Sequence, residues 1–169
     1  VVFEANSQLK TIQSNAFAWN YNLQHVEVPA SVTIIESSAF SGSRNLEAIN
    51  VATSNAVYAS INGVLYNADQ SSLIAYPSGK TDISYEIPSG VLRIEDSAFR
   101  YASHLTSVTF ADDSVTSIGR EAFASTEIRT ISLPSSLKRI GDYAFAWNHR
   151  LGAVSIPASV DYVGWEAFR

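Results

Sequence analysis

Hydrophobic residues recur along this chain in a pattern that repeats about every 23 residues. The dipeptide Ala-Phe marks the period, and its phenylalanines are Phe17, Phe40, Phe99, Phe123, Phe145 and Phe168. Apolar positions before each pair fall into the same register, giving the consensus LxxVxIPxxVxxIGxxAFxxNxx. The chain holds only eight phenylalanines, so six placed in one register indicate an internal structural repeat.

The V-x-I step of the consensus has a period of two, which is typical of a short strand with one buried face. The proline after it lacks a backbone donor and predicts the end of that strand. The glycine predicts a second bend where a Cβ atom would clash, and the Ala-Phe pair predicts a corner with a large side chain inside. The expected strands lie near residues 1–3, 26–28, 49–51, 85–87, 108–110, 131–133 and 154–156.

A single coil of this kind buries too few side chains to offset the entropy of ordering its backbone. Stacked coils share apolar faces and pair their strands, so the repeat predicts a solenoid rather than a globular fold. We expect one domain over residues 1–169, wound as a right-handed coil with one parallel sheet and little helix. The seven strands should follow sequence order, and the Ala-Phe phenylalanines should be buried, the four inner ones most fully.

One coil departs from the period, because Phe40 and Phe99 are 59 residues apart. The extra sequence, residues 57–77, contains Asn62-Gly63 between two apolar runs, a strong signal for a β-hairpin. Asn67 to Ser72 predicts a second turn. We therefore expect an inserted antiparallel β-meander that projects from the solenoid as an appendage. Its replacement by a short Gly/Ser turn should leave a folded solenoid.

The repeats IGxxAF and LxxVxIPxxV, with the segment SINGVLYN…LIAYPSGK, resemble the BspA-type leucine-rich repeats of bacterial surface proteins over essentially the whole chain. The resemblance implies a leucine-rich-repeat coil in a secreted or surface-exposed protein that adheres to host components, matrix or other cells. The family often has a cysteine three residues after the phenylalanine. Here that position holds Asn20, Ser43, Ala102, Thr126 and Asn148, which removes any thiol chemistry.

Composition narrows the function further. The formal net charge is −5, which disfavours a protein that tracks nucleic-acid phosphates. Cysteine is absent, and no apolar run is long enough to span a membrane. Both ends interrupt the repeat, so we expect a fragment of a longer protein, with any signal or anchor outside residues 1–169.

No pattern in the sequence predicts catalysis, a cofactor or a metal. Gly79-Lys80-Thr81 imitates the end of a phosphate-binding loop, but the required earlier glycine is Ile74. Asp112-Asp113 fits a solvated turn better than weak calcium binding. The three histidines, His25, His104 and His149, occupy different positions of the repeat and cannot form a row of ligands. A non-catalytic binding scaffold is the interpretation that remains.

Three sets of residues are candidates for contact with a partner. The first is the strand row, the outward residues between the two strand hydrophobics, namely Glu27, Asn50, Glu86, Thr109, Ser132 and Ser155. The second is the corner aromatics two residues after each phenylalanine: Trp19, Tyr101 and Trp147. The third, which we favour, is the meander tyrosines Tyr58, Tyr66 and Tyr76, which combine apolar area with a polar tip.

Each set has a plainer interpretation, since the strand row can face solvent and the aromatics can serve packing. For Trp19 we favour packing into the space left by Gly42. The expected partner is a host or matrix protein, or a glycan, bound outside the cell or on its surface. The alternative function is a stalk or spacer that presents another domain.

Overall fold

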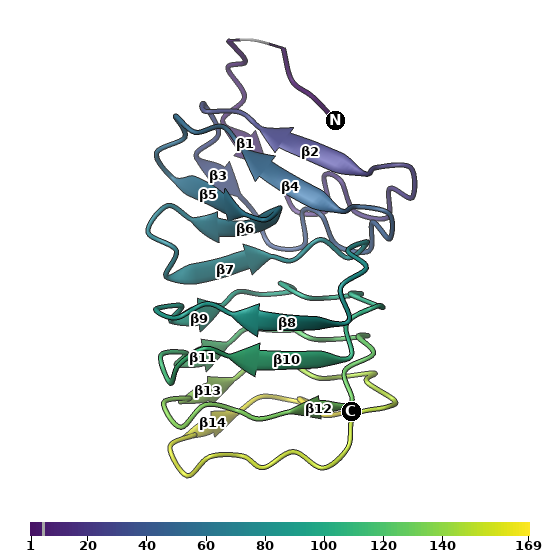
Figure 1. The fold of residues 1–169 in the computed structure, drawn as a ribbon, viewed down its shortest axis with the longest axis vertical. Helices are drawn as coiled ribbons and strands as arrows, with labels where there is room; N and C mark the ends of the chain where they lie inside the picture. Colours follow the sequence, from purple (N-terminus) through teal and green to yellow (C-terminus); the bar gives the residue numbers. More distant parts are fainter. Residues whose placement is uncertain (5) are drawn as a thin grey trace.

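The computed structural model describes residues 1–4 and 6–169, and these form a β-solenoid whose coils stack along one axis (Figure 1). Strands lie along two sides of the coils, and no helix occurs in the described part of the chain. The predicted solenoid is confirmed. All strand pairs are parallel except those within the insert, as expected.

The first side holds the strands that the V-x-I step predicts. They are β2 (His25–Val28), β4 (Ala48–Val51), β8 (Ser84–Ile87), β10 (Ser107–Phe110) and β12 (Thr130–Ile131). Buried and exposed residues alternate most clearly in β2, where Val26 and Val28 are buried while Glu27 is exposed, and Ile49 is the buried residue of β4. The alternation places the apolar face inside the coil.

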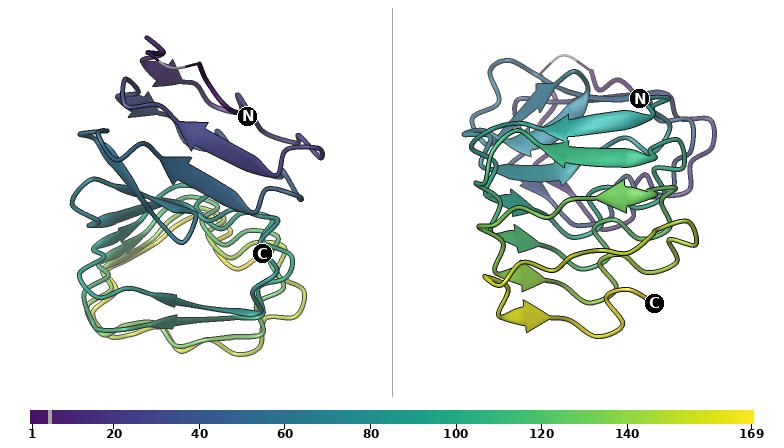
Figure 2. Two further views of the ribbon diagram at one scale, coloured as in Figure 1. Left: turned by 45° about the horizontal axis from the view of Figure 1, so that its top comes forward. Right: turned by 60° about the horizontal axis from the view of Figure 1, so that its bottom comes forward.

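The expectation of seven strands in one sheet is wrong. This side is divided into a β2–β4 pair and a β12–β10–β8 sheet. The edge of β4 is occupied by the insert, because Ile49 N–H donates to the Gly63 carbonyl (2.8 Å) and Val51 N–H to Ser60 Oγ (3.1 Å). Figure 2 shows β2 and β4 running at an angle to β8 and β10. Residues 1–3 and 154–156 form no strand.

The second side was not expected as a sheet. It contains β1 (Thr11–Ile12), β3 (Ile34–Ile35), β7 (Ser72–Ala75), β9 (Arg93–Ile94), β11 (Ser117–Ile118), β13 (Arg139–Ile140) and β14 (Tyr162–Val163). These strands form a β1–β3 pair and a separate sheet in the order β14–β13–β11–β9–β7, which the insert extends. Glycines follow several of these strands where successive coils touch. A Cβ atom on Gly141 would lie 2.6 Å from the carbonyl carbon of Gly119, so the close approach of two backbones requires glycine here.

The corner at the Ala-Phe pair uses left-handed backbone on both sides of the pair. In one coil Ser97 has a φ of 60° and Tyr101 a φ of 65°, and the other coils repeat this arrangement. Left-handed conformations cost non-glycine residues about 1–2 kcal/mol each. Hydrogen bonds between coils offset that cost, as Phe99 N–H donates to Ala122 O (2.7 Å) and Tyr101 N–H to Ala124 O (3.1 Å).

The phenylalanines of the corners stack into a ladder inside the solenoid. Ring centroids of Phe99 and Phe123 lie 4.8 Å apart, and those of Phe123 and Phe145 lie 5.2 Å apart. The four inner phenylalanines are buried, as expected, whereas Phe17 is half-buried and Phe168 is 38% exposed. The ladder fills the interior on the corner side of each coil.

The insert is antiparallel as predicted, with β5 (Tyr58–Ile61) paired to β6 (Val64–Asn67) and β6 paired to β7, and the register of the second pair shifts between Leu65 and Tyr66. The expectation that it is an appendage is wrong. Strand β6 separates two hydrophobic cores: Leu65 packs into the core of the N-terminal coils, while Val64 and Tyr66 pack into that of the C-terminal coils. All three side chains are 0% exposed. The insert therefore forms a buried layer between the two cores.

Burial of the insert gives an expected pH dependence. Loss of solvation raises the pKa of Tyr66 and of Tyr76 well above the ordinary value of about 10. Above pH 10 the unfolded chain loses these phenolic protons while the folded chain keeps them. The stabilisation is therefore complete below pH 10 and falls by about 1.4 kcal/mol per pH unit for each buried tyrosine above it.

Urea unfolding between pH 9 and pH 11 measures this fall in the free energy of unfolding. Tyr66→Phe should make the fall less steep, whereas Tyr21→Phe, at an exposed position, should not. An equal slope for all three proteins would show that the buried phenols ionise freely in the folded state.

Candidate functional site

The coil that contains the insert lacks part of a corner. Ile94 and Phe99 are five residues apart, and Ile35 and Phe40 have the same separation. In the insert coil Leu73 pairs with Ile94, and Tyr76 takes the place of the phenylalanine only three residues later. Tyr76 N–H donates to Ala98 O (2.7 Å) and its ring stacks on Phe99 at 5.1 Å, as the equivalent phenylalanines do. Two corner residues are missing before it.

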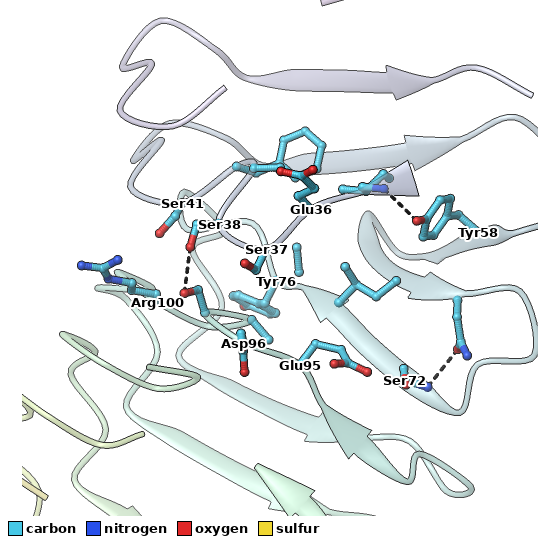
Figure 3. A pocket seen from close by; sticks show the side chains of 18 of the residues that line it. Glu36, Ser37, Ser38, Ser41, Tyr58, Ser72, Tyr76, Glu95, Asp96 and Arg100 are labelled. Carbon is cyan, nitrogen blue, oxygen red and sulfur yellow. Dashed lines mark hydrogen bonds between the residues drawn. The ribbon is translucent and has the colours of Figure 1, made fainter. Parts of the chain in front are cut away.

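The missing corner leaves a cleft at the junction of the N-terminal and C-terminal coils, here called the seam cleft (Figure 3). Its volume is about 390 Å³. The corner that ends β3 forms one wall, the corner that ends β9 forms the other, and strand β7 and the Tyr76 ring lie between them. Ile74, Ala75, Ala39 and Phe40 give the cleft an apolar floor.

The backbone ladder between corners is interrupted at the same place. Phe17 N–H donates to Ala39 O (2.8 Å), and Phe123 N–H to Ala144 O (2.8 Å). The N–H of Phe40 has no such partner among the described residues, although Phe40 is buried. The hydroxyl of Ser41, a residue that is 9% exposed, also has no hydrogen-bond partner there. The Phe40 N–H, the Ser41 hydroxyl and the Arg100 Nε, all on residues that line the cleft, therefore lack hydrogen-bond partners among the described residues.

Charged groups surround the opening. Glu36 accepts a hydrogen bond from Ser14 N–H (2.9 Å) and Asp96 one from Arg120 N–H (2.7 Å), which orients both carboxylates. Of the two cleft arginines, Arg93 pairs with Glu95 at 3.4 Å and Arg100 with Glu121 at 2.7 Å. Within residues 1–4 and 6–169, Glu36 and Asp96 have no basic partner. The opening therefore has an excess of negative charge.

Direct contacts hold the two walls together around the cleft. Ser38 Oγ and Ser97 Oγ, at the same repeat position 59 residues apart, form a hydrogen bond of 2.9 Å. Tyr58 Oη accepts the Ile35 N–H (2.8 Å), replacing the strand partner that β3 lacks on the side opposite β1 (Figure 3). The geometry is that of a preformed binding cleft, with apolar floor, polar walls and fixed carboxylates.

Comparison with known proteins places the repeat. The model of the BspA type leucine-rich repeat region matches residues 2–86 and 80–169, in six copies. The chain belongs to the BspA-type leucine-rich repeat family. No curated protein matches the chain.

Solved structures share the fold of this BspA-type chain. The pneumococcal vaccine antigen PcpA superposes with a TM-score of 0.87 and 33% identity over 96% of the chain. A leucine-rich cell surface protein from Faecalibacterium prausnitzii gives a TM-score of 0.68 and 30% identity over 94% of the chain. The chain spans 40% of the first protein and 52% of the second. A repeat protein from Eubacterium ventriosum, 22% identical, shares the fold with a TM-score of 0.59.

The meander tyrosines of this BspA-type solenoid do not form an exposed patch. Tyr66 is 0% exposed and hydrogen-bonds to the hydroxyl of Tyr85, and Tyr76 is 4% exposed. The expectation that they are exposed on a projecting meander is therefore wrong for both, although Tyr76 lines the seam cleft. Tyr58 is half-buried and lines the seam cleft, so its candidacy moves to that site.

The strand row is exposed but divided. Glu27 accepts a hydrogen bond from Asn50 Nδ2 (2.6 Å) on β2 and β4, whereas Glu86 and Thr109 lie side by side on β8 and β10. The break between β4 and β8 separates the two halves of the row. Contact of these residues with a partner stays a prediction.

The corner aromatics fall into two groups. Trp19 packs over Gly42, where a Cβ atom would lie 2.7 Å from the indole, as expected, while 46% of the residue stays exposed. Its ring also contacts Tyr101 at 4.7 Å across the seam, and Arg100 lies 4.7 Å above the Tyr101 ring. Trp147 stacks on Tyr143 at 5.7 Å. Tyr101 and Trp147 are half-buried, so both serve packing while keeping part of their surface open.

The described residues contain no cluster of three potential metal ligands. They also contain no helix long and apolar enough to cross a membrane. Asp112 accepts hydrogen bonds from Ser114 and Gly90, which lower its pKa, so it caps a turn. Asp113 accepts two hydrogen bonds from Ser135 in the next coil. Both carboxylates therefore have structural roles.

Sequence reasoning missed the seam cleft. The signal for it was present in Ala75-Tyr76, which precedes Ala98-Phe99 by one period of 23 residues. Tyrosine in place of phenylalanine concealed this pair. With the pair recognised, the short distance from Leu73 to Tyr76 predicts an incomplete corner.

Proposed function

We propose that this chain is part of a non-catalytic binding scaffold in a secreted or cell-surface bacterial protein that functions in adhesion or protein–protein recognition. The observation that carries the proposal is the seam cleft, a preformed concave site with an apolar floor in a repeat fold. Residues of its lining carry polar groups without hydrogen-bond partners among the described residues, including the Phe40 N–H and the Ser41 hydroxyl, and a partner can satisfy them.

Membership of the BspA-type family supports a scaffold rather than an enzyme. The similar structures include one named as a vaccine antigen and one named as a cell surface protein, and both descriptions are consistent with an extracellular place of action. The partner under this proposal is a host or matrix protein, or a glycan. Solenoids gather affinity from several coils, so the exposed strand row can add contacts to those of the cleft.

A binding screen tests the proposal. The purified 169-residue chain is immobilised and exposed to arrays of extracellular-matrix proteins and of glycans. We expect saturable binding to at least one member, and weaker binding after Ala39→Leu, which fills the cleft. Gly152→Ala, at an open surface position, serves as a control. If nothing binds, or if the cleft variant binds as the parent does, the scaffold role of this site is wrong and a spacer role is favoured.

A further inference from the structure

The seam cleft selects for a positively charged ligand group. Glu36 comes from the wall before the seam and Asp96 from the wall after it, and both are exposed at the opening. Arg93 and Arg100 are already paired with Glu95 and Glu121. Glu36 accepts its hydrogen bond from the coil before the seam and Asp96 from the coil after it, so the two carboxylates flank the opening from opposite sides. The unbalanced charge at the opening is therefore negative and attracts a cation.

The floor restricts the shape of that cation. Phe40 and Tyr76 are buried below the opening, and Ala39, Ile74 and Ala75 complete an apolar surface. A bare metal ion would leave this surface unused. A lysine side chain fits both the apolar floor and the negatively charged opening, since its four methylene groups can lie along the floor while the ammonium group stays at the carboxylates.

The unsatisfied groups indicate a polypeptide as the carrier of the lysine. The N–H of Phe40 has no acceptor among the described residues, whereas in the other coils a backbone carbonyl from the next corner fills that role. The buried hydroxyl of Ser41 can likewise bond to a peptide group. A segment that replaces the missing corner would supply carbonyl groups at these positions. This observation is independent of the charge at the opening.

We propose that the seam cleft binds an extended, lysine-bearing segment of a partner polypeptide. The lysine stem contacts Phe40 and Tyr76, its ammonium group lies between Glu36 and Asp96, and the segment backbone accepts the Phe40 N–H. This inference rests on the proposed function and specifies the partner chemistry at the same site. A glycan is the competing occupant, and the experiment distinguishes the two.

The test uses a defined peptide, acetyl-Ser-Ala-Lys-Ala-Ser-amide, titrated into the full chain by calorimetry and by NMR. A second peptide carries norleucine in place of lysine, so that the stem is kept and the charge is lost. A third probe, chitotriose, represents the glycan. We expect saturable binding of the lysine peptide and at least tenfold weaker binding of the norleucine peptide and of chitotriose.

The matched variant is Glu36→Gln with Asp96→Asn. Both substitutions keep the oxygen that accepts a backbone hydrogen bond and remove only the charge, so folding should be unaffected. We expect about tenfold weaker binding of the lysine peptide, with the norleucine peptide unchanged. Glu47→Gln with Asp161→Asn, which removes two exposed carboxylates outside both the cleft and the strand row, should leave all affinities unchanged.

Three results would overturn the inference: equal affinity for the lysine and norleucine peptides, an unchanged affinity in the Glu36→Gln, Asp96→Asn variant, or saturable binding of chitotriose alone. None of these results overturns the proposed function, because the binding screen can still identify a partner whose binding is weakened by Ala39→Leu. Conversely, the lysine peptide can bind although the binding screen finds no partner. That result would support a lysine site in the cleft and contradict the proposed adhesion role.

Discussion

Replacement of residues 58–69 by Gly-Ser-Gly is expected to abolish the single cooperative unfolding transition of the chain. The deletion removes Val64, Leu65 and Tyr66, which are buried in two different cores. Burial of three such side chains contributes about 5–8 kcal/mol, which is comparable with the whole stability of an ordinary domain. The edge of β4 also loses its hydrogen bonds to Gly63 and Ser60.

Differential scanning calorimetry, combined with circular dichroism, measures this effect. We expect either two separate transitions, one for each core, or no transition in the N-terminal coils. Thr53→Gly with Ser54→Gly, in an exposed loop, should preserve the parent profile. A hairpin-deleted chain that melts in one transition near the parent temperature would show that the insert is an appendage after all.

Phe123→Ala is expected to lower the free energy of unfolding by about 3–5 kcal/mol. Phe123 is 0% exposed and its ring is stacked between Phe99 at 4.8 Å and Phe145 at 5.2 Å. Its removal opens a cavity in the middle of the ladder. The backbone on either side is held to neighbouring coils by hydrogen bonds and cannot collapse to fill the space.

Urea denaturation of Phe123→Ala and Phe168→Ala provides the comparison. Phe168 occupies the same repeat position but is 38% exposed, and its ring stacks on the ring of Phe145. We expect a clearly smaller loss for Phe168→Ala. Equal losses in the two variants would mean that position in the ladder does not determine the contribution of a ring.

The repeat, its period and its corners could be predicted because each depends on local sequence. The alternation of Val26, Glu27 and Val28 defines a strand face, and the Ala-Phe pair defines a corner wherever it occurs. The second row of strands escaped prediction because its members contain only two residues in most coils, too few to show a period.

The place of the insert could not be predicted from its own sequence. Asn62-Gly63 indicates a hairpin, but it does not say whether both faces of that hairpin will be covered. The faces of β6 are apolar on both sides, since Leu65 alternates with Val64 and Tyr66, and this pattern is typical of a strand between two layers. The tyrosines carried a polar group, which favoured the wrong expectation of an exposed patch.

The candidate site results from residues that are missing from one repeat, and missing residues are hard to recognise in a sequence pattern. The seam cleft exists because two corner residues are missing between Leu73 and Tyr76. Its charges come from Glu36 and Asp96, which are 60 residues apart and occupy nearly equivalent positions in two coils. Only the stacking of those coils across the seam brings the two carboxylates to one opening.

Amide hydrogen exchange at Phe40, measured by NMR with and without the lysine peptide, tests most directly whether the interrupted ladder is the binding site. In the free protein we expect Phe40 to exchange much faster than Phe99 and Phe123, whose amides donate to the next coil at 2.7 and 2.8 Å. Saturation with the peptide should slow exchange at Phe40 and leave the other two unchanged. A Phe40 amide that is as protected as Phe99 in the free protein, or unaffected by bound peptide, would contradict the account.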